Sequence, residues 1–181
     1  MMKIKKIAMQ LCLSSAVLAA MPAFAAEAVQ SSARHYVVKN LNIGDLPVKT
    51  IVPITAKTAE QAIAQAQVIA SNPNADVAEF RIDLLEFSAE SKKVIALGQQ
   101  LNQILKDKPL IATIRTHNEG GKMTVSDQDY EKIYHEYLKK PFMQLLDIEM
   151  FRDAVNVAKL TKLAHEKNVL VIMSNHDFAK T

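Results

Sequence analysis

Cysteine is almost absent from this sequence. Its 181 residues include one, Cys12, which lies in an N-terminal stretch with the order of a signal peptide. The chain that remains after signal cleavage forms no disulfide and offers no thiolate to a metal ion. A disulfide-stabilised extracellular module and a zinc–thiolate site are therefore excluded.

A hydrophobic run long enough to span a membrane is also lacking at the N-terminus. The apolar stretch from residue 7 to residue 21 is shorter than the roughly 20 residues that a transmembrane helix needs. Three lysines in the first six residues precede it, and the small-x-small sequence Ala23-Phe24-Ala25 follows it, as in secretory signals. We predict a cleaved signal over residues 1–25, a flexible lead-in over residues 26–34 and a periplasmic or secreted location.

An excess of one charge is missing from the mature chain. The sequence has 22 basic and 19 acidic residues, but three of the basic ones belong to the signal, so the remaining 156 residues carry 19 of each. The formal net charge of +3 is therefore a property of the signal. We predict one domain with no nucleic-acid partner and, after signal cleavage, no membrane partner.

Several cofactor and nucleophile signatures are absent as well. The sequence contains no H-E-x-x-H zinc motif, no phosphate-binding G-x-G-x-x-G or G-x-x-x-x-G-K-[ST] loop and no G-x-S-x-G nucleophile turn. Gly120-Gly121 indicates only a loop. We therefore predict neither a metal site nor a bound cofactor.

What the sequence does contain is a repeated alternation of strand-like and helix-like segments. A short hairpin over residues 35–44, with its turn at Lys39-Asn40, precedes them. Alternation with short loops predicts parallel strand pairing and an α/β architecture. The last predicted strand is continuously apolar, which is typical of strands buried on both faces. The predicted strands are residues 50–54, 77–82, 110–114, 143–148 and 169–173, and the predicted helices are residues 59–70, 88–106, 126–140 and 152–167.

Four of the five predicted strands end in charged or hydrogen-bonding residues. The carboxyl ends of parallel strands meet at the edge where α/β proteins bind ligands, so we expect these groups to converge on a site. Residues two apart share a face of a strand, which places Glu79, Arg81 and Asp83 together. An internal network of ion pairs, such as Glu79 with Arg115 or Arg81 with Glu149, is the competing interpretation. The four clusters are residues 79–83, 113–116, 147–149 and 174–177.

His176 is the histidine best placed for acid–base chemistry, because it follows a strand end within a polar loop. His117 is a weaker candidate, and His35, His135 and His165 fall on the hairpin or on helix faces, where we expect them to be exposed. The arginines of the clusters suit carboxylate and hydroxyl groups. The residues alone therefore predict a sugar-like or hydroxy-acid ligand that a histidine handles without a cofactor.

In order and spacing, the clusters resemble the type I 3-dehydroquinate dehydratases. The resemblance extends from about residue 35 to the last residue and covers only the N-terminal portion of the family's barrel. It implies a (β/α)₈ TIM barrel over residues 35–181, truncated after the fifth strand and preceded by an N-terminal β-hairpin. We expect the fifth strand of such a barrel to form an open apolar edge. The matching segments are E-F-R-I-D at 79–83, T-I-R-T at 113–116, E-G-G at 119–121, D-I-E at 147–149 and M-S-N-H-D-F at 173–178.

The resemblance also implies an activity. The family removes water from 3-dehydroquinate to give 3-dehydroshikimate, through an imine that a lysine forms with the ketone. His176 corresponds to the histidine that abstracts the proton next to the imine, and Glu119 to the carboxylate that supports this histidine. Glu79, Arg81 and Arg115 correspond to substrate-binding positions. A homodimer is a further expectation for the full-length form.

One catalytic group of the family has no counterpart in this sequence. The imine-forming lysine lies on a sixth strand of the family's barrel, and Lys180 belongs instead to the loop after His176. We expect little or no dehydratase activity from the chain alone, because no other residue supplies the covalent electron sink. The alternative function is an inactive exported binding or assembly remnant of the same fold.

Two further expectations concern architecture and location. A five-stranded flavodoxin-like fold is the alternative architecture, but residues 55–58 lack the glycine of a phosphate-binding loop. The predicted signal indicates that quinate or dehydroquinate is used outside the cytoplasm.

Overall fold

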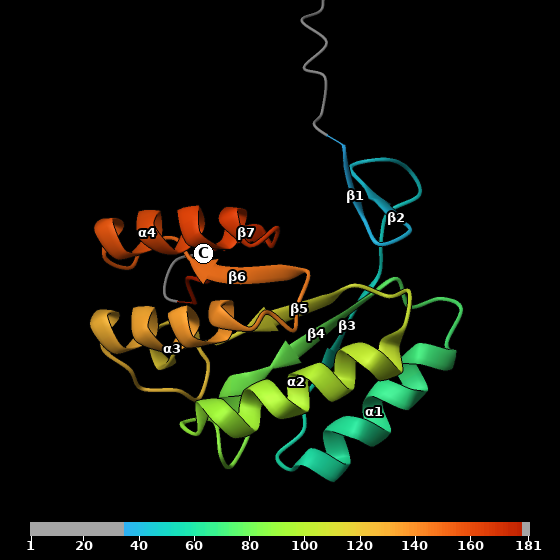
Figure 1. The fold of residues 1–181 in the computed structure, drawn as a ribbon, viewed down its shortest axis with the longest axis horizontal. Helices are drawn as coiled ribbons and strands as arrows, with labels where there is room; N and C mark the ends of the chain where they lie inside the picture. The colour runs from blue at the N-terminus through green and yellow to red at the C-terminus, as the bar shows by residue number, and fades with distance from the viewer. Residues whose placement is uncertain (1–34, 179–181) are drawn as a thin grey trace, which may run out of the picture. The chain divides into compact units, whose positions relative to one another are not determined.

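In a computed structural model of the protein, residues 35–178 are described (Figure 1). The predicted signal over residues 1–25 and lead-in over residues 26–34 lie outside this range, as does Lys180. The strands are β1 (Tyr36–Val38), β2 (Leu41–Ile43), β3 (Ile51–Ile54), β4 (Val77–Arg81), β5 (Leu110–Thr113), β6 (Leu145–Glu149) and β7 (Leu170–Ser174). The helices are α1 (Ala59–Ser71), α2 (Ser91–Leu105), α3 (Asp127–Lys139) and α4 (Ala154–Glu166), with 3₁₀ turns η1 (Ile82–Leu84) and η2 (His117–Glu119).

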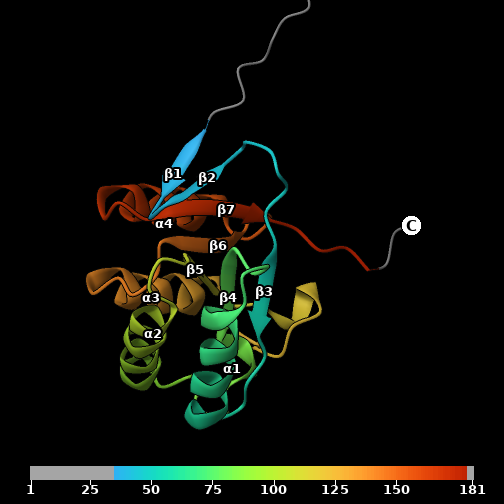
Figure 2. The ribbon, with the colours of Figure 1, turned by 90° about the vertical axis from the view of Figure 1, so that its right-hand side faces the viewer.

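The strands from β3 onward form one parallel sheet in the order β3-β4-β5-β6-β7. A helix follows each of the first four of these strands and crosses over to the next, and α1–α4 lie along one face of the sheet (Figures 1 and 2). Strands β1 and β2 pair antiparallel, with Lys39 in the left-handed region at their turn. The predicted α/β architecture and N-terminal hairpin are confirmed.

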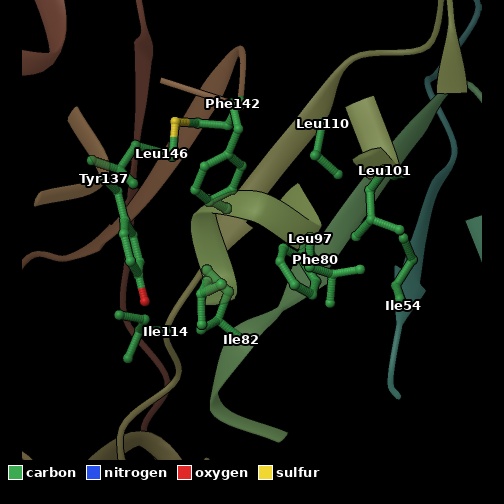
Figure 3. Packing of buried hydrophobic residues seen from close by; sticks show 14 of the residues in the cluster. Ile54, Phe80, Ile82, Leu97, Leu101, Leu110, Ile114, Tyr137, Phe142 and Leu146 are labelled. Carbon is green, nitrogen blue, oxygen red and sulfur yellow. The ribbon is translucent and has the colours of Figure 1, made fainter. Parts of the chain in front are cut away.

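The two faces of the sheet bury different partners. Along β4, Phe80 faces the helices, whereas Glu79 and Arg81 alternate onto the opposite face. The helix-covered face holds the main core, in which Phe80 shares one apolar cluster with Leu97 of α2 and Tyr137 of α3 (Figure 3). Burial of this apolar surface stabilises the sheet and the helices as one unit.

The hairpin closes the amino-terminal end of the other face. Val38 of β1 packs with Val77, Ile111 and Leu145, which lie near the starts of β4, β5 and β6. Since this apolar plug occupies one end of the interior, the inward-facing polar side chains gather at the other end. The site therefore forms at the carboxyl ends of the strands.

One predicted boundary is wrong in a way that matters for the site. The predicted strand over residues 77–82 ends at Arg81, and Ile82–Leu84 form the η1 turn. Asp83 therefore does not share a strand face with Glu79 and Arg81. The other predicted elements agree with the structure to within two residues, except that turns over residues 85–90 delay the start of α2 by three.

The expectation that the fifth strand of the sheet is an open apolar edge is confirmed, although its continuous apolar run is typical of a strand buried on both faces. Strand β7 pairs only with β6 and forms one edge of the sheet, as β3 forms the other. Met173 is 44% exposed, and the rest of β7 is half-buried. A hollow of about 750 Å³ with mostly apolar walls lies along α4 and the end of β7. Within residues 35–178, no helix is both long and apolar enough to cross a lipid bilayer.

Candidate active site

Arg115 is the centre of a polar cluster at the carboxyl ends of β5, β6 and β7. Its side chain is buried, and its guanidinium contacts three carboxylates. Nη2 lies 3.0 Å from Asp147 Oδ1, and Nη1 lies 3.2 Å from Glu119 Oε2 and 3.5 Å from Glu149 Oε1. Nη1 also donates to Ser174 Oγ at 2.9 Å. Only the folded sheet brings these residues together, because they come from two strands and from the loop after a third.

Burial and charge oppose each other in this cluster. Desolvation by itself lowers the pKa of Arg115, but the charges of Asp147, Glu149 and Glu119 outweigh it, and the pKa is raised. Burial raises the pKa of Asp147, and the nearby charge of Glu79 adds to this effect, while Arg115 opposes both. Three carboxylates around one guanidinium leave an excess of negative charge, which favours further cations nearby.

Glu119 links the cluster to His176. Its Oε2 accepts a hydrogen bond from the His176 backbone N–H at 3.1 Å and lies 3.0 Å from the ring nitrogen Nδ1. A carboxylate only accepts, so this contact favours the tautomer with its proton on Nδ1 and leaves the Nε2 lone pair free. Glu119 is buried, whereas the His176 side chain is 41% exposed. The pair has the geometry of a general base held by a buried carboxylate.

A groove of about 540 Å³ opens beside this pair. Its walls are the two loops over residues 117–120 and 175–178. Phe178 stacks on the His176 ring, with the ring centroids 6.4 Å apart. His176 is therefore part of the wall of a space that a small molecule can enter.

The loop after β5 holds Glu119 in place through close backbone packing. Gly121 N donates to Thr116 O at 2.8 Å. A Cβ atom at Gly121 would overlap the carbonyl of Arg115, so only glycine fits there. The Gly120-Gly121 pair, which indicated only a loop, thus positions a residue of the site.

Arg81 pairs with Asp83 and not with Glu149. Its Nε and Nη2 each lie 2.9 Å from an oxygen of Asp83, and this hydrogen bonding raises the pKa of Arg81. The buried Asp83 also accepts from the backbone N–H groups of Arg115 at 3.3 Å and Lys122 at 3.1 Å. The η1 turn follows β4 directly and brings the Asp83 carboxylate within hydrogen-bond distance of the loop after the neighbouring strand β5.

Glu79 does not pair with Arg115. Among residues 35–178 its carboxylate makes no hydrogen bond or ion pair, although its charge raises the pKa of both Arg81 and Asp147. It is also partly exposed. The carboxylate is thus available to a ligand hydroxyl, in contrast to the other acidic groups of the cluster.

Comparison with known proteins identifies the family. A family model described as type I 3-dehydroquinase matches residues 50–181 of this chain. The chain belongs to the type I 3-dehydroquinase family.

Solved structures agree with this assignment. The 3-dehydroquinate dehydratase of Enterococcus faecalis superposes with a TM-score of 0.78 at 39% identity, over 81% of this chain and 60% of that one. The type I 3-dehydroquinate dehydratase of Clostridium difficile superposes with a TM-score of 0.78 at 33% identity, over 82% of this chain and 58% of that one. The predicted family and barrel fold are confirmed.

Curated relatives in the type I 3-dehydroquinase family are longer than the matched region. The chain is 78% identical over 159 residues to the catabolic 3-dehydroquinate dehydratase of Acinetobacter baylyi, over 87% of this chain and 58% of the relative. It is 39% identical over 145 residues to the 3-dehydroquinate dehydratase of Enterococcus faecalis, which is 80% of this chain and 57% of the relative. The chain thus spans slightly less than three fifths of the length of these relatives.

The type I 3-dehydroquinase fold places the predicted site residues in two groups. Arg115, Glu119 and His176 form one continuous chain of contacts, and their proposed roles remain predictions. Glu79 and Arg81 face the same side of the sheet on the neighbouring strand β4. His117 is exposed at the groove, and His35, His135 and His165 are exposed, as expected. Within residues 35–178, no three His, Cys, Asp or Glu side chains are placed to hold a metal ion.

Four residues of the site have no catalytic or binding role in the sequence prediction. Asp147 and Ser174 stand out only as polar strand ends, Glu149 also as a possible partner of Arg81, and Arg152 as the first residue of a predicted helix. The structure places Arg152 Nη1 3.2 Å from Glu149 Oε2. The available signal was its position three residues after a predicted buried carboxylate, which on its own also fits an exposed helix start.

Proposed function

We propose that the chain supplies the acid–base part of a 3-dehydroquinate dehydratase active site. The observation that carries the proposal is the Glu119–His176 pair, in which a buried carboxylate holds an accessible imidazole at the carboxyl ends of parallel strands. The chain is 78% identical to a catabolic 3-dehydroquinate dehydratase, which supports 3-dehydroquinate as the substrate.

The pair performs the proton transfers of a dehydration. In the proposed Schiff-base mechanism, a lysine condenses with the substrate ketone, and the resulting imine accepts the electron pair left when the neighbouring C–H bond breaks. His176 Nε2 takes that proton and returns it to the departing hydroxyl, which leaves as water. Hydrolysis of the imine, which takes up the water lost in the condensation, then releases the product and restores the lysine. Glu119 stabilises the imidazolium that forms in between.

The remaining residues bind and orient the substrate. Glu79 has a free carboxylate for a substrate hydroxyl, and the Arg81 side chain on the same face of β4 is 23% exposed. Arg115 retains its proposed binding role, and its ion pair with Glu119 also fixes the support of His176. By family resemblance, the imine-forming lysine belongs to a sixth strand, and a segment that carries this strand would supply the imine.

The test combines this chain with the part of the Acinetobacter relative that follows the matched region. We expect little or no dehydroshikimate from the chain alone and clear turnover from the mixture, followed by the ultraviolet absorbance of the conjugated product. Borohydride added with substrate should reduce the imine and label a lysine of the added segment. Turnover by the chain alone, with the label on one of its own lysines, would contradict the proposal.

His176→Ala in the mixture is the matched catalytic variant. We expect turnover to fall by ~10²–10⁴-fold, the usual loss for a removed general base, while His117→Ala in the same groove changes it little. If the wild-type mixture assembles and binds substrate without turnover, the inactive binding or assembly remnant is the better description.

The location of the chain forms a separate part of the proposal. We propose that it is exported and acts on quinate-derived substrate in the periplasm, supported by the signal pattern of residues 1–25 and by the catabolic relative. Cell fractionation followed by N-terminal sequencing should find a mature chain that begins at Ala26. An uncut chain in the cytosol would contradict export.

The expected homodimer of the complete enzyme can be checked by sedimentation.

A further inference from the structure

A second buried arginine lies behind the cluster around Arg115. Arg152 follows β6 and is only 8% exposed in its side chain. Its Nη1 donates to Glu149 Oε2 at 3.2 Å, and its Nη2 lies 2.7 Å from Asp127 Oδ1 and donates to Val125 O at 3.0 Å. Its guanidinium carbon lies 4.5 Å from the centroid of the Tyr130 ring. Both Nη atoms thus have hydrogen-bond or ion-pair partners, and an aromatic ring lies against the guanidinium carbon.

Glu149 is shared between the two arginines. Its Oε1 faces Arg115 Nη1 at 3.5 Å and accepts from Thr116 N at 2.8 Å, while its Oε2 faces Arg152 and accepts from Thr116 Oγ1 at 2.8 Å. Glu149 is 1% exposed, so water does not neutralise its charge. Each oxygen of Glu149 therefore has one cationic partner, Arg115 or Arg152. Removal of one arginine strengthens the attraction between Glu149 and the remaining arginine.

Arg115 Nη1 is the point of competition. The same nitrogen contacts Glu149 at 3.5 Å and Glu119 at 3.2 Å, so a stronger attraction to one carboxylate weakens its contact with the other. Glu119 in turn lies 3.0 Å from His176 Nδ1. The charge on Glu119 that Arg115 leaves unneutralised acts on the imidazole at this short distance.

We propose that Arg152 is a positioning residue that sets the proton affinity of His176 through Glu149, Arg115 and Glu119. The inference rests on the proposed function, in which His176 is the base. With Arg152 in place, the charge of Glu149 is balanced by its ion pair with Arg152, and Arg115 remains bound to Glu119. Without Arg152, Glu149 draws Arg115 towards itself, Glu119 gains effective negative charge, and the imidazolium form of His176 is stabilised. His176 then binds its proton more tightly, so a smaller fraction of it is in the neutral form that can accept a proton at a given pH.

Other charged groups also face His176, directly or through Arg115, and they are the same in all the variants below apart from Glu149. They are Glu119 and His117 of η2, Arg115 after β5, Asp147 and Glu149 of β6, Asp177 of its own loop, and Glu79, Arg81 and Asp83 of β4 and η1. The comparison between variants therefore isolates the contribution of the Arg152 charge.

The test is the pKa of His176 in the full chain, measured by NMR titration of the histidine ring nitrogens, with His176→Gln to assign its signal. Arg152→Gln should raise this pKa by about 0.5–1 unit, an indirect fraction of the shift that a directly adjacent charge produces. Arg152→Lys, which keeps the charge, should recover most of the difference. Asp127→Asn is the matched control, because it removes an exposed contact of Arg152 without touching Glu149, and it should leave the pKa unchanged.

Glu149→Gln is a second, independent test, in which the pKa of His176 is expected to shift in the opposite direction. It removes the competitor for Arg115, so the pKa of His176 should fall, and this arm applies even where Arg152→Gln does not fold. An unchanged His176 pKa in a folded Arg152→Gln chain, or a rise in Glu149→Gln, would overturn the inference.

The proposed function and the role of Arg152 are decided by different measurements. In the active mixture with the relative's segment, Arg152→Gln should move the acidic limb of the kcat profile to higher pH with little change in KM. If the wild-type mixture shows no turnover, the proposed function fails, while the NMR titrations still decide whether Arg152 controls His176.

Discussion

At the scale of single residues, a tyrosine hydroxyl connects two strands at the site. Tyr134 is buried, and its hydroxyl accepts from Ile114 N and donates to Asp147 O, each at 2.8 Å. These contacts lie just beyond the last paired residues of β5 and β6, Ala112 and Leu146. The hydroxyl therefore replaces a ladder hydrogen bond beneath Arg115, and its burial raises the pKa of Tyr134 well above the usual range.

Tyr134→Phe should destabilise the fold by about 1–3 kcal/mol, because it leaves a buried N–H and a buried carbonyl without partners. Urea unfolding gives the change directly. Tyr137→Phe on the same helix is the control, since its buried hydroxyl has no partner among the described residues and its loss should change the stability little. Equal effects of the two substitutions would contradict the bridging role.

At the scale of elements, the fit between helices depends on one position without a side chain. Gly98 lies within α2, and a Cβ there would overlap the Phe142 ring after α3. Phe142 is buried and packs edge-to-face with Tyr137, whose ring in turn packs on Tyr134. This aromatic row joins α2 and α3 and holds the helix that carries Tyr134.

Gly98→Ala should destabilise the fold, although alanine favours the helix by about 1 kcal/mol, because overpacking costs about 1–3 kcal/mol. Phe142→Leu in the same chain should relieve the overlap, so the double substitution should cost less than the sum of the single ones. Thermal unfolding of the four chains measures this coupling. Strict additivity would show that Gly98 and Phe142 do not constrain each other.

At the scale of the whole molecule, both edges of the sheet expose apolar surface. The hollow along α4 and β7 and a second one of about 360 Å³ between β3 and α1 lie where neighbouring strands and helices of a barrel pack. Val68 on α1 and Phe151 before α4 are 67% and 74% exposed. Such patches commonly mark interaction surfaces.

The segment of the Acinetobacter relative that follows the matched region should therefore stabilise the chain by mass action, by about 2.7 kcal/mol at 100 times its Kd. Ala158→Glu, within the hollow on α4, should weaken this effect, whereas Gln100→Glu on the outer surface of α2 should not. Melting temperatures at increasing segment concentration test this. A gain that is equal in both variants would place the contact elsewhere.

The linear pattern alone was sufficient for the order of the elements and for the polar strand ends. Hydrophobic periodicity reflects which face of a helix or strand is buried, so nearly all boundaries agree with the structure. For β7 the apolar run alone does not distinguish a central strand from an edge strand, and the expectation of an edge came from the resemblance to the first five strands of a barrel. It also placed Asp83 on the strand face of Glu79 and Arg81, because nothing local indicates that the η1 turn begins at residue 82.

The sequence by itself determined that Arg115 and His176 would lie at one end of a parallel sheet, because that follows from the chemistry of strand ends and short connections. Glu119 was assigned to the same site only by the family resemblance. Which acid pairs with which base was decided only by the tertiary structure. Arg81 bonds Asp83, Arg115 is divided among three carboxylates, and Arg152 reaches Glu149 from behind. Ion pairs form over a few ångströms, and distances on that scale are set by the twist and register of strands that lie far apart in the chain.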